Sequence, residues 1–171
     1  MIGLACHPDT PSAAVRQVRA RVTRPRADRL DVSYAIEADL SDLRIPAPQP
    51  PRFAERLWQH SCCELFITRK GERAYREFNF SPSGEWAAYA FTRYREGAPL
   101  RDEKLDPGIA VRRSAQELRL DASVACERGK LALALSAVIE DADGRLSYWA
   151  LGHAPGKPDF HHPDAFGLEL D

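Results

Sequence analysis

Three polar side chains stand inside stretches of the sequence that otherwise have the character of packed strands. Glu64 lies within the apolar run 62–67, and Glu77 and Asn79 lie within the run 75–80. A carboxylate in such surroundings needs a partner, because removing a charge from water is costly. Successive side chains of a strand alternate between its faces, so Glu77 and Asn79 share one face. If Glu64 projects beside them from a neighbouring strand, the group could accept hydrogen bonds from the hydroxyls of a ligand.

The same carboxylates have two other interpretations. Either of them could hold Arg76 or Arg93 in a structural ion pair, since buried charges are usually paired. Two nearby carboxylates could also act as the acid and nucleophile of a glycosidase, but nothing in the sequence sets their separation. No Gly-x-Ser-x-Gly, Gly-x-Gly-x-x-Gly or Gly-Lys-Ser/Thr motif is present. We therefore expect a binding protein rather than an enzyme.

Two tryptophans could supply flat apolar surfaces beside these acceptors. Trp58 follows the proline-rich stretch 45–51 and precedes polar residues, which favours partial exposure. Trp86 follows the turn signal 81–84 and could face a cleft or belong to the core. A flat ring next to fixed acceptors suits a polyhydroxylated ring, whose faces alternate between C–H and O–H groups. Trp149 lies in an apolar run and is expected in the core.

Histidines gather near the C-terminus, at His153, His161 and His162, close to Asp159 and Asp164. Such a set could hold a divalent metal, but the spacing matches no specific metal motif. We therefore expect no cofactor and keep a divalent metal as the alternative. The segment 156–161, which includes Lys157, is expected to form a loop that closes over the core or a ligand site.

The elements that must position these residues are predicted to be strands. Side chains alternate with period two in short runs that are broken by Pro, Gly, Asp and Asn. Runs 18–22 and 30–36 predict a hairpin, and runs 62–67, 75–80 and 86–91 predict a meander. Further strands are expected at 109–113, 117–122, 130–136, 146–151 and 166–170, although the leucine and alanine content of 130–136 also suits a helix. We predict an all-β fold, an antiparallel β-sandwich that is jelly-roll-like with immunoglobulin-like layering and has one or two short helices at most.

Length and charge limit the remaining possibilities. The 171 residues suit one domain spanning 1–171, and a formal net charge of -1 provides no field that would attract nucleic acid or an anionic membrane. No apolar run approaches the roughly 18 residues of a transmembrane helix. The N-terminus lacks a basic, signal-like region, so we expect a cytoplasmic protein. The cysteines, none in a Cys-x-x-Cys spacing, are expected to be reduced: Cys6, Cys62, Cys63 and Cys126.

Three segments resemble the DOMON-like proteins and the related type 9 carbohydrate-binding modules. They are Leu57-Trp58 with 62–67, the stretch 75–86, and the stretch 158–168, which together span positions 57 to 168. The resemblance implies a β-sandwich whose strand ends and loops form a ligand site, used for sugars in some relatives and for haem in others. Haem is therefore a further alternative cofactor, although Met1 is the only methionine, which argues against the methionine–histidine ligation that some haem-binding relatives use.

We therefore predict a non-enzymatic domain that binds a small molecule, most plausibly a carbohydrate. A haem- or metal-binding DOMON-type protein that uses the C-terminal histidines is one alternative, and a scaffold that binds another protein is a second. The sequence leaves the oligomeric state open. The predicted ligand-binding residues are Trp58, Glu64, Tyr75, Glu77, Asn79, Trp86, Arg93, Lys157 and His161.

Overall fold

The computed structural model describes all residues from Met1 to Asp171 and contains twelve strands, every one paired antiparallel. There is no α-helix; the only helical elements are four 3-10 helices of three residues each, and none of them has the length and apolarity to cross a membrane. The 3-10 helices are η1 (Leu40–Asp42), η2 (Leu57–Gln59), η3 (Glu103–Leu105) and η4 (Pro163–Ala165). The strands are β1 (Ile2–Cys6), β2 (Val15–Arg26), β3 (Arg29–Ala38), β4 (Cys62–Arg69), β5 (Tyr75–Phe80), β6 (Trp86–Arg93), β7 (Glu96–Pro99), β8 (Ala110–Arg113), β9 (Glu117–Ala125), β10 (Leu131–Glu140), β11 (Leu146–Ala150) and β12 (Leu168–Leu170).

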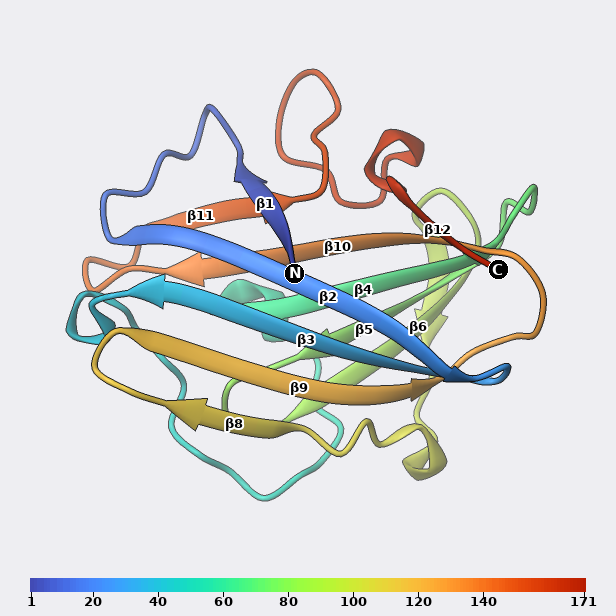
Figure 1. Cartoon of the computed structure of the whole chain (residues 1–171), viewed down its shortest axis with the longest axis horizontal. Coiled ribbons are helices and arrows are strands. Elements are labelled where there is room, and N and C mark those ends of the chain that lie inside the picture. The colour runs from blue at the N-terminus through green and yellow to red at the C-terminus, as the bar shows by residue number, and fades with distance from the viewer.

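The strands lie in two facing layers (Figure 1). Sheet A has the spatial order β1-β2-β3-β9-β8, and sheet B has the order β7-β6-β5-β4-β10-β11, with β12 paired to β10. Strand β1 joins the layers, because Ile2 and Leu4 pair with β2 whereas Ala5 and Cys6 pair with β11. The predicted antiparallel β-sandwich is confirmed.

The core lies between the layers and follows from the period-two pattern. Leu30, Val32 and Tyr34 of β3 face the interior from sheet A, and the leucines of β10 at 131, 133 and 135 face it from sheet B. The Tyr34 hydroxyl donates a hydrogen bond across the sandwich to the main-chain carbonyl of Glu64 at 2.6 Å. Burial of these apolar side chains is the dominant favourable term in folding.

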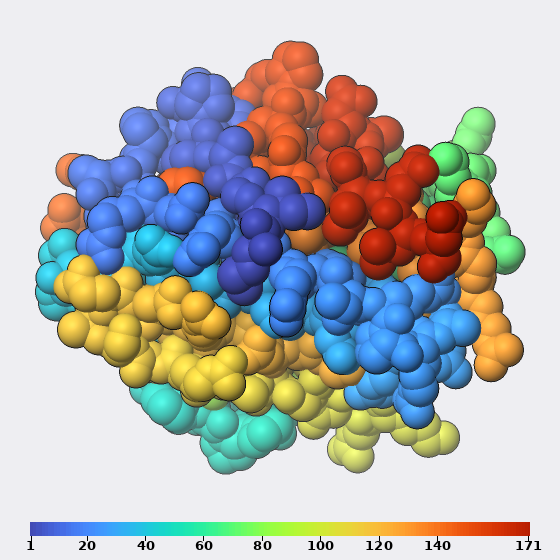
Figure 2. All heavy atoms as spheres, viewed as in Figure 1, coloured from blue at the N-terminus to red at the C-terminus, as the bar shows by residue number.

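Most of the expected elements are found. The hairpin β2–β3 and the meander β4–β5–β6 form as predicted. The stretch 130–136 is strand rather than helix, since it pairs with β4 and, at Leu131–Leu133, with β12. The short strands β1 and β7 carry little alternation and were not predicted. In the space-filling view, sheet A forms the near face, and the first and last segments of the chain, blue and red, reach the surface there (Figure 2).

A second, smaller apolar cluster forms on the outer face of sheet B. Phe66, Tyr75 and Val138 project outward from this sheet and meet Phe160 and Ala165 from the segment between β11 and β12. This segment, residues 151–167, folds back over the sheet and is helped by Gly156, whose φ of +100° strongly favours glycine. Because the segment covers only part of the outer face, it leaves a pocket beside it.

Candidate functional site

A pocket of about 410 Å³ opens on the outer face of sheet B. Its volume falls within the range of about 300–1,000 Å³ that is usual for small-molecule sites. Five strands, the 3-10 helix η2, the β6–β7 turn and the segment between β11 and β12 contribute to its lining, so positions far apart in the sequence meet there. The lining residues are Trp58, Glu64, Glu77, Tyr89, Phe91, Arg95, Val138, Tyr148, Pro158, Phe160 and His161.

The polar part of the pocket lies on a cross-strand row of sheet B. Glu64 of β4 pairs in register with Asn79 of β5 on one side and with Ser136 of β10 on the other. All three side chains are buried, and neither amide atom of Asn79 nor the Ser136 hydroxyl makes a hydrogen bond. Buried polar groups in proteins nearly always have a partner, so an unsatisfied row next to a pocket is unusual. The expected juxtaposition of Glu64 with Asn79 is therefore present.

The two carboxyl groups are held in an environment that disfavours their charge. Glu64 is 3% exposed, and burial followed by repulsion from Glu77 raises its pKa well above its ordinary range. Burial also raises the pKa of Glu77 to about 7, although the neighbouring Asn79 amide and the more distant Arg95 charge oppose this shift. Groups with such perturbed pKa values concentrate at functional sites.

His161 forms the side of the pocket next to Glu77. Its Nδ1 lies 2.9 Å from the Tyr75 hydroxyl, which accepts a hydrogen bond from the main-chain N–H of Arg95. We assign the Tyr75 hydrogen to His161 Nδ1, which leaves the Nε2–H of the neutral ring directed at Glu77, 3.6 Å away. Burial, reinforced by the Arg95 charge, lowers the pKa of His161 to about 4, so the ring is neutral near pH 7.

Asp159 ties the loop after β11 to the turn between β6 and β7. Its carboxylate accepts hydrogen bonds from Arg95 Nη2 at 2.8 Å, from the Tyr94 hydroxyl, and from the main-chain N–H of His161. Arg95 adopts a left-handed conformation with φ +57°, which ends β6 and turns the chain back into β7. The ion pair therefore holds one wall of the pocket in place.

Trp58 also lines the pocket and is 47% exposed, unlike the other two tryptophans. It sits in η2, which packs against β4 and β5. The residues that follow fasten this turn to β10, since His60 Nδ1 lies 2.7 Å from Glu140 and the Ser61 hydroxyl accepts a hydrogen bond from the main-chain N–H of Glu140. An exposed indole on a fastened turn is a surface on which a flat ligand can stack.

The structure brings together some of the predicted site residues and separates others. Trp58, Glu64, Glu77 and His161 line the pocket, and Tyr75 and Asn79 lie against it as described above. The remaining predicted residues are elsewhere and are described next.

Trp86, Arg93 and Lys157 do not reach the pocket. Trp86 is 2% exposed and packs edge-on against Phe53 within the core, because it is on the inward face of β6. Arg93 is at the exposed end of β6 and pairs with Glu96 at 2.7 Å. Lys157 is exposed in the loop next to Pro158.

Several lining residues were not predicted. Tyr89 and Phe91 could have been found, because they pair in register with Glu77 and Tyr75 and so share their face. Arg95, rather than Arg93, is the arginine at the site, and Tyr148 and Phe160 come from distant parts of the chain. No local pattern in the sequence marks these three residues.

The three C-terminal histidines do not converge. His153 contacts the main-chain oxygen of Ala5 and the ring of His7, and His162 caps η4, whereas His161 alone lies at the pocket. No group of three or more His, Cys, Asp or Glu side chains has an arrangement that could hold a metal ion. All four cysteines are free thiols.

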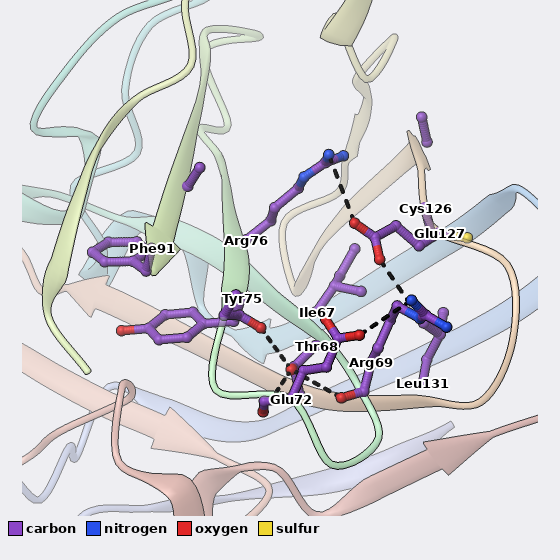
Figure 3. Close-up of a pocket in the computed structure, with 13 residues that line it drawn as sticks. Ile67, Thr68, Arg69, Glu72, Tyr75, Arg76, Phe91, Cys126, Glu127 and Leu131 are labelled. Atoms are coloured by element: carbon purple, nitrogen blue, oxygen red, sulfur yellow. Dashed lines mark hydrogen bonds and ion pairs between the residues drawn. The ribbon is translucent and has the colours of Figure 1, made fainter. Parts of the chain in front are cut away.

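A second hollow lies at one end of the sandwich, between the β4–β5 turn and the start of β10 (Figure 3). Its volume is about 120 Å³, well below the usual size of a ligand site. Its charged groups already have partners: Arg69 pairs with Glu72 and Glu127, and Arg76 lies 4.0 Å from Glu127. It lacks the buried, unsatisfied polar groups that lie next to the 410 Å³ pocket, which we take as the candidate functional site.

Comparison with solved structures supports the β-sandwich architecture, whereas two other comparisons found no match. No protein-family model and no curated protein matches the chain. Among solved structures, a proposed carbohydrate-binding protein from Bacteroides uniformis is similar over 99% of this chain and 84% of its own, with 15% identity and a TM-score of 0.72.

Two structures of a family 9 carbohydrate-binding module from Caldicellulosiruptor kristjanssonii are also similar. The complex with glucose has 12% identity and a TM-score of 0.54, over 90% of this chain and 76% of the module. The complex with cellotriose has 13% identity and a TM-score of 0.51, over 90% and 75%. At these identities the likeness shows the fold alone, a β-sandwich. The DOMON part of the resemblance stays a prediction.

Proposed function

We propose that the pocket on sheet B binds a carbohydrate, and that the protein is a binding module rather than an enzyme. The observation that carries the proposal is that the buried carboxyl group of Glu64 and the exposed indole of Trp58 line the same pocket. A sugar ring needs an aromatic face for its C–H groups and buried acceptors or donors for its hydroxyls, and the pocket offers both.

The supporting arguments are chemical and architectural. Glu64 and Glu77, with raised pKa values, can donate as well as accept hydrogen bonds near neutral pH, which matches the dual character of a sugar hydroxyl. The similar module from Caldicellulosiruptor kristjanssonii was solved with glucose and with cellotriose. In this proposal stacking and hydrogen bonds suffice, and neither a metal nor haem takes part.

Tryptophan fluorescence tests the proposal directly. Trp86 and Trp149 are buried, so a change on titration with a sugar reports mainly on Trp58. We expect glucose or cellotriose to change the emission with a dissociation constant in the micromolar to millimolar range, as expected for one stacked ring and a few hydrogen bonds. The Trp58→Phe variant serves as the control for the origin of the signal. The proposal would be contradicted if glucose, galactose, mannose and cellotriose all left both the tryptophan emission and the NMR chemical shifts unchanged.

A further inference from the structure

The pocket contains two carboxyl groups that no cationic side chain of the protein neutralises. Glu64 takes part in no salt bridge; its cross-strand neighbours, Asn79 and Ser136, are uncharged, and Glu77 repels its charge. The only ion-pair contact of Glu77 is His161 Nε2 at 3.6 Å, and that ring is neutral at pH 7. The ionisable groups on the floor of the pocket are therefore two carboxyl groups without a cationic partner.

Arg95 also lines the pocket, but it compensates the carboxyl groups only in part, because the pKa of Glu77 remains raised to about 7 despite the Arg95 charge. The Arg95 guanidinium already has two partners: it forms an ion pair with Asp159 at 2.8 Å and donates a hydrogen bond to the Tyr94 hydroxyl at 3.2 Å. The carboxylate of Asp159 therefore offsets much of the Arg95 charge. Neither Glu64 nor Glu77 forms a salt bridge with an arginine or a lysine, and the only such contact of Glu77 is the neutral His161 ring.

An uncompensated pair of buried carboxyl groups is costly when it is charged, and the empty protein avoids the cost by holding protons. A ligand that brings its own positive charge removes the same cost and gains charge-assisted hydrogen bonds, which are roughly twice as strong as neutral ones. A neutral hydroxyl in the same place gains only the weaker bonds.

The walls favour a cation as well. Trp58, Tyr89, Phe91, Tyr148 and Phe160 all line the pocket. The face of an aromatic ring attracts a positive charge, and the attraction grows when water is excluded. A pocket lined by five aromatic side chains and two carboxyl groups is thus suited to an ammonium group.

We propose that the preferred ligand is an amino sugar, bound with its protonated amine against Glu64 and Glu77 and its ring against Trp58. This inference rests on the proposed carbohydrate-binding function. The sugar ring supplies the C–H face and hydroxyls that the indole and the polar row receive, and the amine supplies the missing charge.

The test compares ligands that differ in charge. Glucose, 2-amino-2-deoxyglucose, 6-amino-6-deoxyglucose, N-acetylglucosamine and cyclohexylamine are titrated at pH 7 by calorimetry and NMR. At least one of the two amino sugars is expected to bind about tenfold or more tightly than glucose and N-acetylglucosamine, the size of effect usual for a hydrogen bond to a charged group.

Three isosteric variants locate the effect. Glu64→Gln and Glu77→Gln are expected to reduce the advantage of the amino sugar over glucose to about twofold or less, as the charge that produces it is removed. Glu85→Gln is the matched control, since Glu85 is a largely buried glutamate that pairs with Arg52 away from the pocket. In this variant the ratio of the amino-sugar affinity to the glucose affinity should equal that of the wild type. Thermal melting of each variant shows that it is folded.

The outcomes separate the two proposals. Binding of glucose with no gain from either amine overturns this inference and leaves carbohydrate binding intact. Failure of every sugar to bind overturns both. Cyclohexylamine binding as tightly as the amino sugars would show that the pocket recognises amines without a sugar, which also overturns the inference.

Discussion

The Tyr75 hydroxyl lies 2.9 Å from His161 Nδ1, so a residue of β5 fixes the orientation of a residue in the loop after β11. The same hydroxyl accepts the N–H of Arg95, and the Tyr75 ring stacks on Phe91 with centroids 4.6 Å apart. Tyr75 therefore holds together the floor of the pocket, its loop wall and the β6–β7 turn. It acts as a positioning residue and does not line the pocket itself.

Removal of this hydroxyl tests the positioning role. We expect Tyr75→Phe to lower the free energy of unfolding by about 1–2 kcal/mol, because a partly buried hydrogen-bond pair is lost, and to weaken sugar binding severalfold as His161 reorients. Urea denaturation and calorimetric titration measure the two effects. Tyr34→Phe is the control: it removes the core hydrogen bond to the Glu64 carbonyl and should lower stability without a comparable change in affinity. Unchanged affinity in Tyr75→Phe would count against the role.

The two tryptophans of the predicted site should respond in opposite ways to substitution. Trp58→Ala is expected to weaken sugar binding by about 1 kcal/mol or more while changing stability little, since the side chain is half exposed. Trp86→Ala is expected to destabilise the fold by about 3–5 kcal/mol, because it empties a core position. Thermal melts and fluorescence or NMR titrations distinguish them. A strongly destabilised Trp58→Ala protein would show that this indole is structural.

Glu77 should make stability depend on pH. Its pKa rises from 4.5 to about 7 on folding, so between these values the folded state keeps a proton that the unfolded state has lost. The free energy of unfolding then falls as the pH rises from 4.5 to 7. Relative to the wild type, Glu77→Gln is expected to gain up to about 3 kcal/mol across this interval, since one pKa unit corresponds to about 1.4 kcal/mol. Urea denaturation at pH 4.5, 5.5, 6.5 and 7.5 measures the difference in the free energy of unfolding between Glu77→Gln and the wild type. A difference that does not change with pH would disprove the raised pKa of Glu77.

His161 should contribute the opposite slope. Folding lowers its pKa from 6.5 to about 4, so the unfolded state binds more protons between these values and the free energy of unfolding rises as the pH rises from 4 to 6.5. His161→Gln is expected to lose stability relative to the wild type over this interval, by up to about 3 kcal/mol. Direct NMR titration of the imidazole provides an independent reading. An imidazole that titrates near 6.5 in the folded protein would contradict the assignment of a neutral, buried ring.

The ion pair between Asp159 and Arg95 should restrain the loop. Asp159→Asn is expected to increase hydrogen exchange in residues 153–163 and to weaken sugar binding severalfold, while global stability changes by less than about 1 kcal/mol, because the pair is partly exposed. Asp164→Asn, in the same loop but paired only with His162, is the control and should leave affinity unchanged. Equal exchange rates in Asp159→Asn and the wild type would mean that other contacts hold the loop.

The sequence by itself determined the strands and their faces. The alternation in β5 places Tyr75, Glu77 and Asn79 on one side and Phe78 and Phe80 on the other, and the structure has the same division, with the phenylalanines in the core. It also singled out Glu64 and Trp58, since a charged residue within an apolar run and an indole beside polar residues each break the local pattern. Local alternation suffices for these conclusions because side-chain direction in a strand has a period of two.

Only the tertiary structure decided which residues meet at the pocket. Trp58 and Trp86 were both predicted at the site, yet the inward face of β6 buries Trp86 against Phe53, whereas Trp58 in η2 is exposed. Arg95 replaces the predicted Arg93 because a left-handed residue in the β6–β7 turn redirects the chain. The loop that carries His161 is placed by contacts with Tyr75 and with the turn at Arg95, far away in sequence. Such contacts depend on strand order and turn geometry, which no local pattern encodes.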